Sequence, residues 1–264
     1  HSAYPLRFFS FGLKGCPPAV PWDKPVHDYV MGDRCNPAPP GTFWRPPDNW
    51  PPPTSPVKFY LHADGGLRTA PPHQADAKLS YRYDPNDPAP TISGQNLHGT
   101  YGPLDQRPVE SRSDVLLFTS EPLSEPLEVT GRIYAELYVS SDCPDTDFTV
   151  KMTDVYPDGR SIILCDGILR ARYHESLERP SLLTAGKVYK LRIDLWSTSV
   201  VFNRGHRIRV AVSSSNFPRF EPNPNTGKLP REGSETRVAT NTVYLSGQQP
   251  SHIILPVDPR QGRP

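Results

Sequence analysis

The segment from Thr146 to Glu175 constrains the fold of this chain more than any other stretch of its sequence. Phe148, Val150 and Met152 alternate with polar residues, and this period of two places apolar side chains on one face of a β-sheet. A turn at Pro157-Asp158-Gly159 follows, in which glycine tolerates a positive φ. The segment therefore predicts three consecutive strands joined by tight turns, with one apolar and one solvent-exposed face.

Similar strand signals recur from residue 57 onward, without helical periodicity. Turn-forming clusters such as Asp64-Gly65-Gly66 and Arg204-Gly205 separate them. The predicted strands are Val57–His62, Leu79–Tyr83, Val115–Thr119, Leu127–Ser140, Phe148–Tyr156, Ser161–Tyr173, Val188–Leu195, His206–Ser213, Thr242–Leu245 and Ile253–Val257. Many short strands without intervening helices indicate an all-β fold, an antiparallel two-sheet sandwich of the jelly-roll type.

The first 56 residues have a different character, because many of the 34 prolines of the chain fall here. Proline removes a backbone donor and argues against long helices. One short helix is predicted from Leu6 to Lys14, ended by Gly15. Residues 16–56 are predicted to form a strap over a surface, with one candidate strand at Val26–Met31. We therefore divide the chain into residues 1–56, helix and strap, and residues 57–264, the sandwich domain.

Charge and hydropathy argue against two classes of partner. Lys plus Arg total 29 against 28 for Asp plus Glu, which leaves no strong field to hold nucleic acid or an anionic membrane. No apolar run approaches the roughly 20 residues that span a bilayer, and the first residues lack the features of a secretory signal. We expect a soluble protein with no nucleic-acid partner and no membrane partner, whose targeting signal is absent or removed.

The sequence holds no pattern typical of metal or cofactor ligands. Its four cysteines, Cys16, Cys35, Cys143 and Cys165, have no C-x-x-C spacing, and its eight histidines form no H-x-x-x-H pair. Nucleotide-binding motifs of the G-x-G-x-x-G and G-x-x-x-x-G-K types do not occur. We expect no cofactor and no metal. The cysteines are interpreted as buried free thiols, with a Cys16–Cys35 disulfide as the alternative.

Residues for nucleophilic catalysis are not recognisable in this sequence. A serine hydrolase of the α/β type holds its serine in a G-x-S-x-G turn, and the chain has none. Ser213-Ser214-Ser215 follows an alternating strand and is predicted to be a loop. Asp145 and Asp147 suggest a carboxylate pair or a calcium site, but they lack the glycine and glutamate of an EF-hand loop. Solvated or turn-capping aspartates are favoured.

Motifs along nearly the whole chain resemble one enzyme family in order and spacing. The matching segments are Leu6–Gly15 (LRFFSFGLKG), Tyr83–Thr91 (YDPNDPAPT), Gly102–Val109 (GPLDQRPV), Leu123–Gly131 (LSEPLEVTG), Val139–Gly167, Ser197–Phe202 (STSVVF), Gly205–Ile208, Ser213–Phe220 (SSSNFPRF), Asn223–Gly227 (NPNTG) and Pro250–Pro256 (PSHIILP). They resemble the cocaine-esterase and X-Pro dipeptidyl-peptidase family of α/β-hydrolases. The matching part of that family is its C-terminal jelly-roll domain, a galactose-binding-like sandwich.

The resemblance implies that the chemistry lies outside this chain. In that family an α/β-hydrolase domain carries a Ser-Asp-His triad, a helical cap shapes the entrance, and the jelly roll packs on both. Residues 1–56 then correspond to the end of the hydrolase domain and its proline-rich exit. The hydrolase and cap domains are the expected partners and a small ester or amide the expected substrate, with no catalytic residue in this chain. His1 is either the family's catalytic histidine or part of a tag, and its short distance from the predicted helix favours the tag.

Two stretches are candidates for the lining of a substrate pocket. The resemblance places Ile92–Pro103 where the jelly roll of the esterase reaches into the acyl pocket, so Leu97, His98 and Tyr101 are candidate lining residues. Asn216 and Phe217 are two more candidates. Ordinary interdomain packing is the alternative for all five, because a pocket wall and a domain boundary expose similar residues, and packing is favoured for the last two.

Other functions compete with this interpretation. A free-standing jelly roll can bind carbohydrate on aromatic platforms, and Trp22, Trp44, Trp50 and Trp196 are available for stacking. A sheet edge of the jelly roll can also mediate a homodimer. The sequence does not separate this scaffold role from that of a hydrolase domain.

Overall fold

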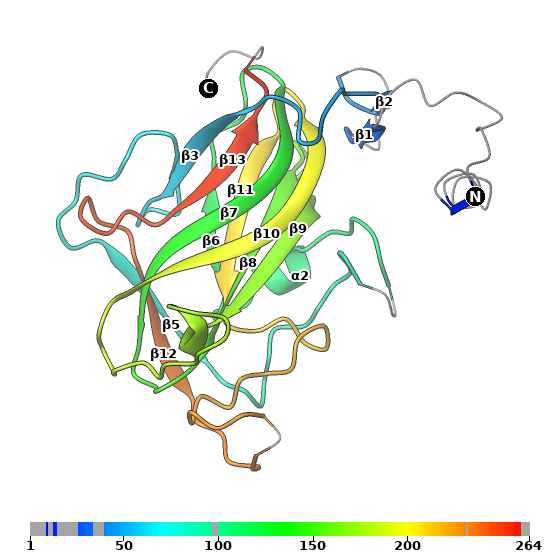
Figure 1. The fold of residues 1–264 in the computed structure, drawn as a ribbon. Helices are drawn as coiled ribbons and strands as arrows, with labels where there is room; N and C mark the ends of the chain where they lie inside the picture. The colour runs from blue at the N-terminus through cyan, green and yellow to red at the C-terminus, as the bar shows by residue number, and fades with distance from the viewer. Residues whose placement is uncertain are drawn as a thin grey trace.

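The computed structural model describes residues 26–33, 40–96, 100–230 and 232–259, together with the separate positions 9, 13 and 14. In this part of the chain two antiparallel sheets pack face to face (Figure 1). One short helix, α2 (Arg107–Glu110), and one 3-10 turn (Ala171–Tyr173) accompany them. The predicted all-β sandwich is therefore confirmed. No helix among the described residues has the length and apolar character needed to cross a bilayer.

The larger sheet is built around β7, a strand of 15 residues. Its seven strands are β3 (Ser55–Leu61), β4 (Leu67–Arg68), β5 (Lys78–Tyr83), β7 (Leu127–Ser141), β10 (Tyr189–Phe202), β12 (Ala239–Tyr244) and β13 (His252–Val257). β10 pairs with one edge of β7, while β13 and then β12 pair in succession with the other. Because β7 is long enough for both, the sheet runs β4-β3-β13-β7-β12-β5 with β10 on the opposite edge of β7.

The smaller sheet has the order β6-β11-β8-β9. Its strands are β6 (Leu116–Thr119), β8 (Asp147–Val155), β9 (Ser161–Arg170) and β11 (Arg207–Ser213). The predicted β8–β9 hairpin is present, and Gly159 takes a φ of 87° in its turn. The predicted third strand is wrong: β9 ends at Arg170, and a 3-10 turn follows. Asp145 and Thr146 accept the main-chain N–H groups of this turn, which bends the chain away from the sheet.

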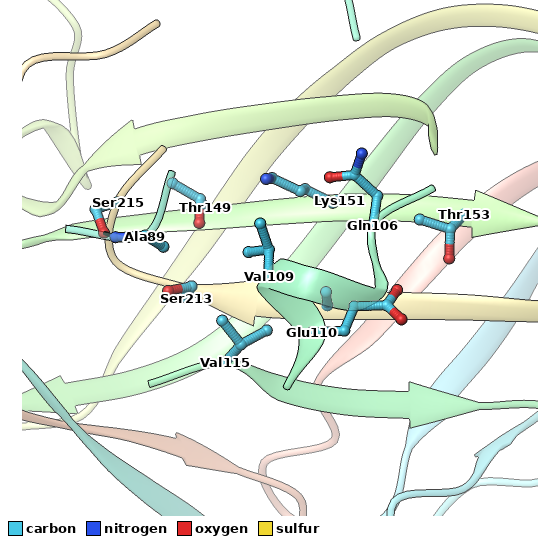
Figure 2. Close-up of a pocket in the computed structure, with 11 residues that line it drawn as sticks. Ala89, Gln106, Val109, Glu110, Val115, Thr149, Lys151, Thr153, Ser213 and Ser215 are labelled. Atoms are coloured by element: carbon cyan, nitrogen blue, oxygen red, sulfur yellow. Dashed lines mark hydrogen bonds between the residues drawn. The ribbon is translucent and has the colours of Figure 1, made fainter. Parts of the chain in front are cut away.

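The second face of β8 is covered, so all of its residues are buried. Thr149, Lys151 and Thr153 point away from the core and, with residues of α2, line a small cavity (Figure 2). The solvent-exposed face predicted for this hairpin is therefore wrong. The covering segment gave no strand or helix signal, and its packing on the sheet depends on contacts distant in sequence.

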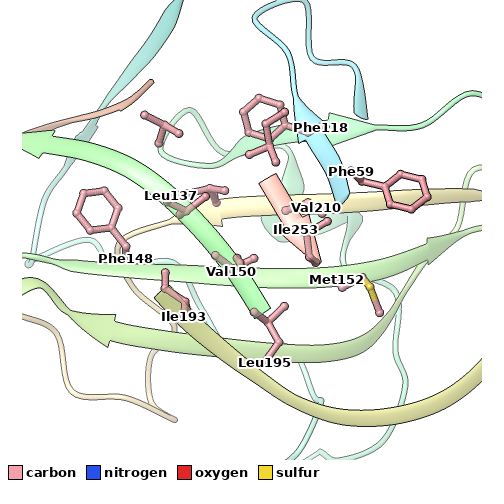
Figure 3. Packing of buried hydrophobic residues seen from close by; sticks show 14 of the residues in the cluster. Phe59, Phe118, Leu137, Phe148, Val150, Met152, Ile193, Leu195, Val210 and Ile253 are labelled. Carbon is pink, nitrogen blue, oxygen red and sulfur yellow. The ribbon is translucent and has the colours of Figure 1, made fainter. Parts of the chain in front are cut away.

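Apolar side chains from both sheets form the core between them (Figure 3). Phe148, Val150 and Met152, whose alternation predicted an inward face, are fully buried. In Figure 3 they lie among side chains of the larger sheet such as Leu137 and Ile193. Burying a side chain of this size stabilises a fold by about 1.5–3 kcal/mol. The period of two in the sequence thus accounts directly for the packing of the two layers.

The proline-rich strap is hydrogen-bonded to the sandwich. Its strands β1 (Asp28–Val30) and β2 (Phe43–Arg45) form a two-stranded antiparallel sheet. The main chain of Met31 donates to Ser199 O at 2.9 Å and accepts from Val201 N at 2.8 Å, which forms a parallel bridge to Val200 of β10. In Figure 1 β1 and β2 lie beside the ends of β7 and β10.

Arg45 adds a side-chain anchor to the strap. Its guanidinium lies 2.8 Å from the Asp28 carboxylate and 2.6 Å from that of Glu128 on β7. Both acids are buried, so the cation is needed to offset the cost of removing two carboxylates from water. The boundary predicted at residue 56 stays a prediction, although the strap is tied to the sandwich on its N-terminal side.

One strand end differs from the sequence-based expectation, and one predicted helix lies outside the described residues. β10 continues past the predicted end at Leu195 to Phe202, through a bulge in which Trp196 has a φ of 69°. Gly167 of β9 permits a close approach to this region, because a Cβ there would lie 2.2 Å from Asp194 O. The predicted helix at Leu6–Lys14 lies outside the described residues, apart from helical positions at Phe9, Leu13 and Lys14.

Candidate functional site

The serine run after β11 is structural. Ser213 Oγ donates to Asp114 O at 2.8 Å, and Ser215 Oγ accepts from Ala89 N at 2.8 Å. Ser214 Oγ lies 2.8 Å from Tyr81 Oη. Ser213 is the last residue of β11, and the predicted loop begins at Ser214. Each hydroxyl of the run holds a neighbouring segment in place.

Four histidines in the described part of the chain have main-chain or carboxylate partners. His62, His174 and His252 bond main-chain carbonyl oxygens. His206 Nδ1 lies 2.9 Å from the Asp154 carboxylate, and its ring is tilted against that of Tyr156 with centroids 4.4 Å apart. His206 therefore has the acid of a catalytic dyad beside it, but the residue is only 3% exposed. His1 and His98 lie outside the described residues.

Asp145 and Asp147 are buried in an ion-pair network, so the solvated half of the expectation for these aspartates is wrong. The turn-capping half holds for Asp145, whose carboxylate accepts the N–H of Arg172 in the 3-10 turn. Asp145 is 0% exposed and lies 2.9 Å from the guanidinium of Arg172, while Asp147 lies 2.9 Å from that of Arg170. Asn223 Nδ2 donates to both carboxylates at 2.8 Å. Burial raises the pKa of Asp147 despite these partners. The two acids fix the loop around residue 223 onto the sheet, a role that the D-x-D spacing alone did not reveal.

The described residues give little support for a reactive cysteine or a metal site. Cys143 and Cys165 are free and buried, as predicted, and burial raises the pKa of the Cys143 thiol to about 12. No group of three or more histidine, cysteine or acidic side chains suited to a metal occurs within the described residues. Cys16 and Cys35 lie outside them, so their pairing stays a prediction.

A groove of about 440 Å³ lies between the strap and the edges of β9 and β10. Tyr29, Met31 and Trp50 of the strap form one wall, and Ile163 and Leu164 of β9 form another. Main-chain segments of the loop that begins at Gly94 complete it. A volume of this size is typical of ligand pockets and interdomain clefts.

Polar groups are few in the groove and lie on its floor. Asp28 and Ser199 are joined by a hydrogen bond of 3.2 Å. The Thr198 hydroxyl, on a residue 7% exposed, has no hydrogen-bond partner among the described residues. A hydroxyl in this state favours a partner group that can exchange a hydrogen bond with it. The groove therefore combines apolar walls with a small number of orienting polar atoms.

The loop of the candidate pocket residues borders this groove. Gly94 and Gly102 pair across its base with hydrogen bonds of 2.9 and 3.2 Å, and both line the groove. Tyr101 is 72% exposed beside this base. Leu97 and His98 lie outside the described residues. Their role in a pocket, like that of Tyr101, stays a prediction.

The other two candidates, Asn216 and Phe217, do not line the groove. They lie beside the segment that leads into the same loop. Asn216 is buried and donates through Nδ2 to the Asp166 carboxylate at 3.0 Å. Phe217 is 46% exposed, and its main chain brackets Pro90 by bonds to Ala89 O and Thr91 N. The structure thus places Asn216 and Phe217 against the segment that leads into the loop, an arrangement expected for packing residues.

Sequence reasoning missed most of the groove. Its walls come from the strap, the loop and two strands, which are far apart in the sequence. Trp50 was recognised as an exposed aromatic candidate, but nothing in the pattern linked it to Thr198 or Leu164. A folded arrangement is needed to bring these residues together.

Fold and site together define a β-sandwich accessory domain with a surface groove. In this domain the run Ser213-Ser214-Ser215 has structural roles. Residues 21–254 match the X-Pro dipeptidyl-peptidase C-terminal non-catalytic domain, and the chain belongs to this family. The family resemblance inferred from the motifs is therefore confirmed.

Three known proteins similar to this chain bear the names of hydrolytic enzymes. The cocaine esterase of Rhodococcus sp. (strain MB1 Bresler) is 43% identical over 95% of this chain. An aminopeptidase from a marine sediment Thaumarchaeota archaeon shares the fold with a TM-score of 0.80 and 32% identity, covering 97% of this chain. An α-amino acid ester hydrolase has a TM-score of 0.75 and 33% identity over 82% of it.

This chain corresponds to less than half of each relative. It spans 44% of the cocaine esterase, 44% of the archaeal aminopeptidase chain and 39% of the α-amino acid ester hydrolase chain. The enzymatic activities of these relatives therefore belong to proteins with substantial sequence beyond the matched part.

Proposed function

We propose that this chain is the C-terminal β-sandwich domain of a serine acyl hydrolase of the esterase, amidase or X-Pro dipeptidyl-peptidase type. It packs on an α/β-hydrolase domain and a cap domain, and it contributes one wall of a pocket for a small ester or amide. The nucleophile belongs to the hydrolase domain. One observation carries this proposal. The chain belongs to a non-catalytic domain family, and the relatives reported above are more than twice its length.

Exposed aromatic residues around the groove support a docking role for this face. Tyr29 is 42% exposed and Trp50 is 41% exposed, and both line the groove. Trp44, 69% exposed, packs edge-on against Tyr29 with ring centroids 5.3 Å apart. Trp196, 60% exposed, precedes the groove residue Ser197. A cluster of this kind is a candidate for coverage by another domain.

The five candidate lining residues have two roles in this proposal. Leu97, His98 and Tyr101 belong to the loop beside the groove and contact the acyl or amino-acid part of the substrate. Asn216 and Phe217 hold the start of that loop. The substrate pocket then forms only where the loop meets the hydrolase domain, which places substrate selection and bond cleavage on different domains.

Kinetics of the polypeptide encoded by the full reading frame test this proposal. Tyr101→Ala is expected to raise KM for a p-nitrophenyl ester with a bulky acyl group by about tenfold, because an aromatic wall is lost. Leu177→Ala, at a residue 78% exposed in the loop after the 3-10 turn, is the matched control and leaves KM unchanged. Equal KM values for both variants would reject a lining role for this loop. Saturable ester turnover by the isolated chain would reject the division of labour between domains.

A homodimer through the sandwich is part of the same proposal. β5 ends the larger sheet, so its outer edge offers unpaired main-chain groups to a second copy. Light scattering of the purified chain measures the mass in solution. A monomer at all concentrations would argue against this contact.

Carbohydrate binding remains the second candidate because Trp44 and Trp196 are strongly exposed. An exposed indole can stack on a sugar ring. Glycan-array screening of the chain distinguishes the two roles: specific hits lost in Trp44→Ala and Trp196→Ala favour this function, and a blank array favours the hydrolase domain.

A further inference from the structure

A second cavity lies between β8 and the segment of helix α2, and it shares no lining residue with the groove. Its volume is about 10 Å³, close to that of one water-sized sphere. Figure 2 shows Lys151 and Thr149 of β8 together with Gln106, which precedes α2, among the side chains that line it. Ala89, Val109 and Val115 make part of the lining apolar, so Gln106, Lys151 and Thr149 bring polar groups into a space with the size of one water molecule.

Lys151 is a buried cation without a direct partner. The residue is 6% exposed, and the described residues offer its ammonium neither a hydrogen bond nor an ion pair within 4.0 Å. Asp166, its cross-strand neighbour on β9, acts on it only through the Coulomb field. Burial lowers the pKa of Lys151 to about 8, so the amine still carries its proton at neutral pH. Most of the Lys151 side chain is removed from water, so an acceptor beside its ammonium offsets part of the lost hydration.

Gln106 supplies a buried acceptor in the same cavity. Its Nε2 donates to Ile92 O at 2.7 Å and to Leu104 O at 3.2 Å, which fixes the orientation of the amide. Its Oε1 has no partner among the described residues, although the residue is only 1% exposed. An orphan acceptor of this kind destabilises the fold if it stays unsatisfied.

We propose that one water molecule is bound in this cavity, accepting a hydrogen bond from the Lys151 ammonium and donating one to Gln106 Oε1. A buried water typically makes about three hydrogen bonds, and the Thr149 hydroxyl on the same wall is the third partner. The water then satisfies two polar groups that the protein leaves without a direct contact.

This water ties the loop of the candidate pocket residues to the sheet. Ile92 and Leu104 are the two ends of that loop, and Gln106 closes its base by bonding both carbonyl groups. Through the water, the closed base is connected to Lys151 at the centre of β8. The importance of this link for substrate binding rests on the proposed function, but the water site itself does not.

A crystal structure of this chain, at a resolution where single waters are placed, tests the site directly. We expect a water within hydrogen-bonding distance of Lys151 Nζ and Gln106 Oε1 in the wild type. The peak is expected to disappear in Lys151→Met and to persist in Lys58→Met, a control at an exposed lysine of β3. A cavity without density, or an amide turned so that Gln106 contacts Lys151 directly, would overturn the proposal.

Hydrogen exchange measures the link to the loop without a substrate. The amides of Gly94 and Gly102, which bond across the loop base, are expected to exchange about tenfold faster in Lys151→Met than in wild type, with β7 amides unchanged. Lys58→Met keeps the wild-type rates. Unchanged Gly94 and Gly102 rates in Lys151→Met would remove the link. Because neither readout uses a hydrolase domain, failure here is distinguishable from failure of the proposed function.

Discussion

Lys151 shows how a buried cation makes stability depend on pH. Its pKa falls from 10.5 to about 8 on folding, with burial as the main cause, so the unfolded chain binds more protons between these values. Wild-type stability is therefore expected to rise with pH across this interval, by up to about 3 kcal/mol from this residue. Lys151→Met removes that contribution.

Urea unfolding of the two proteins below, within and above the interval measures this effect. The advantage of Lys151→Met over wild type is expected to be largest below pH 8 and to shrink as the pH approaches 10.5. A constant difference at every pH would show that the ammonium is not desolvated in the folded chain.

Arg172 is also a buried cation, but unlike Lys151 it has direct ion-pair and hydrogen-bond partners. It lies against Asp145, and its Nη2 donates to Gly227 O and Lys228 O. Arg172→Met is expected to cost about 3–5 kcal/mol in the free energy of unfolding, since the Asp145 carboxylate is left buried without its cation. Arg179→Met, at an exposed arginine, serves as the control and is expected to change stability by less than about 0.5 kcal/mol. Similar chemical denaturation midpoints for both variants would contradict the account of the network.

The strap is the element whose attachment depends most on one residue. Arg45→Met leaves the buried carboxylates of Asp28 and Glu128 without a shared cation. The strap is therefore expected to detach more often, and the amides of Met31 and Val201 to exchange at least about tenfold faster. Arg82→Met, at an exposed position on β5, is the matched control. Equal exchange in the two variants would mean that the main-chain bonds alone hold the strap.

Elements with strong local patterns were predictable from the sequence. The ten strands predicted after residue 56 all have counterparts, since alternation and turn clusters are properties of neighbouring residues. The short strands β2 and β4, helix α2 and the end of β9 were not predicted. Each depends on partners distant in sequence, as the 3-10 turn after Arg170 depends on Asp145 and Thr146.

The candidate site was predictable only in part. The motifs placed Tyr101 on a boundary loop, and the structure shows it exposed beside the groove. Thr198 and Lys151 gave no signal, because burial without a partner is a property of the assembled sandwich. The same holds for the aspartates at 145 and 147, whose sequence spacing suggests solvent exposure while the fold encloses them.

The molecule as a whole combines a rigid sandwich with one face rich in exposed aromatic residues. In Figure 1 the strap and the loop that leads to α2 extend on the same side of the sandwich, and the groove lies between them. We propose that this face contacts a hydrolase domain and that bond cleavage takes place on that domain. No serine of this chain is then the nucleophile.

Labelling with a fluorophosphonate, which modifies activated serines covalently, tests this claim most directly. The polypeptide encoded by the full reading frame and the isolated chain are treated in parallel, and the labelled peptide is identified by mass spectrometry. We expect stoichiometric labelling of the longer polypeptide at a serine outside the residues of this chain, and no labelling of the isolated chain. Stoichiometric modification of a serine within this chain, such as one of Ser213 to Ser215, would contradict it.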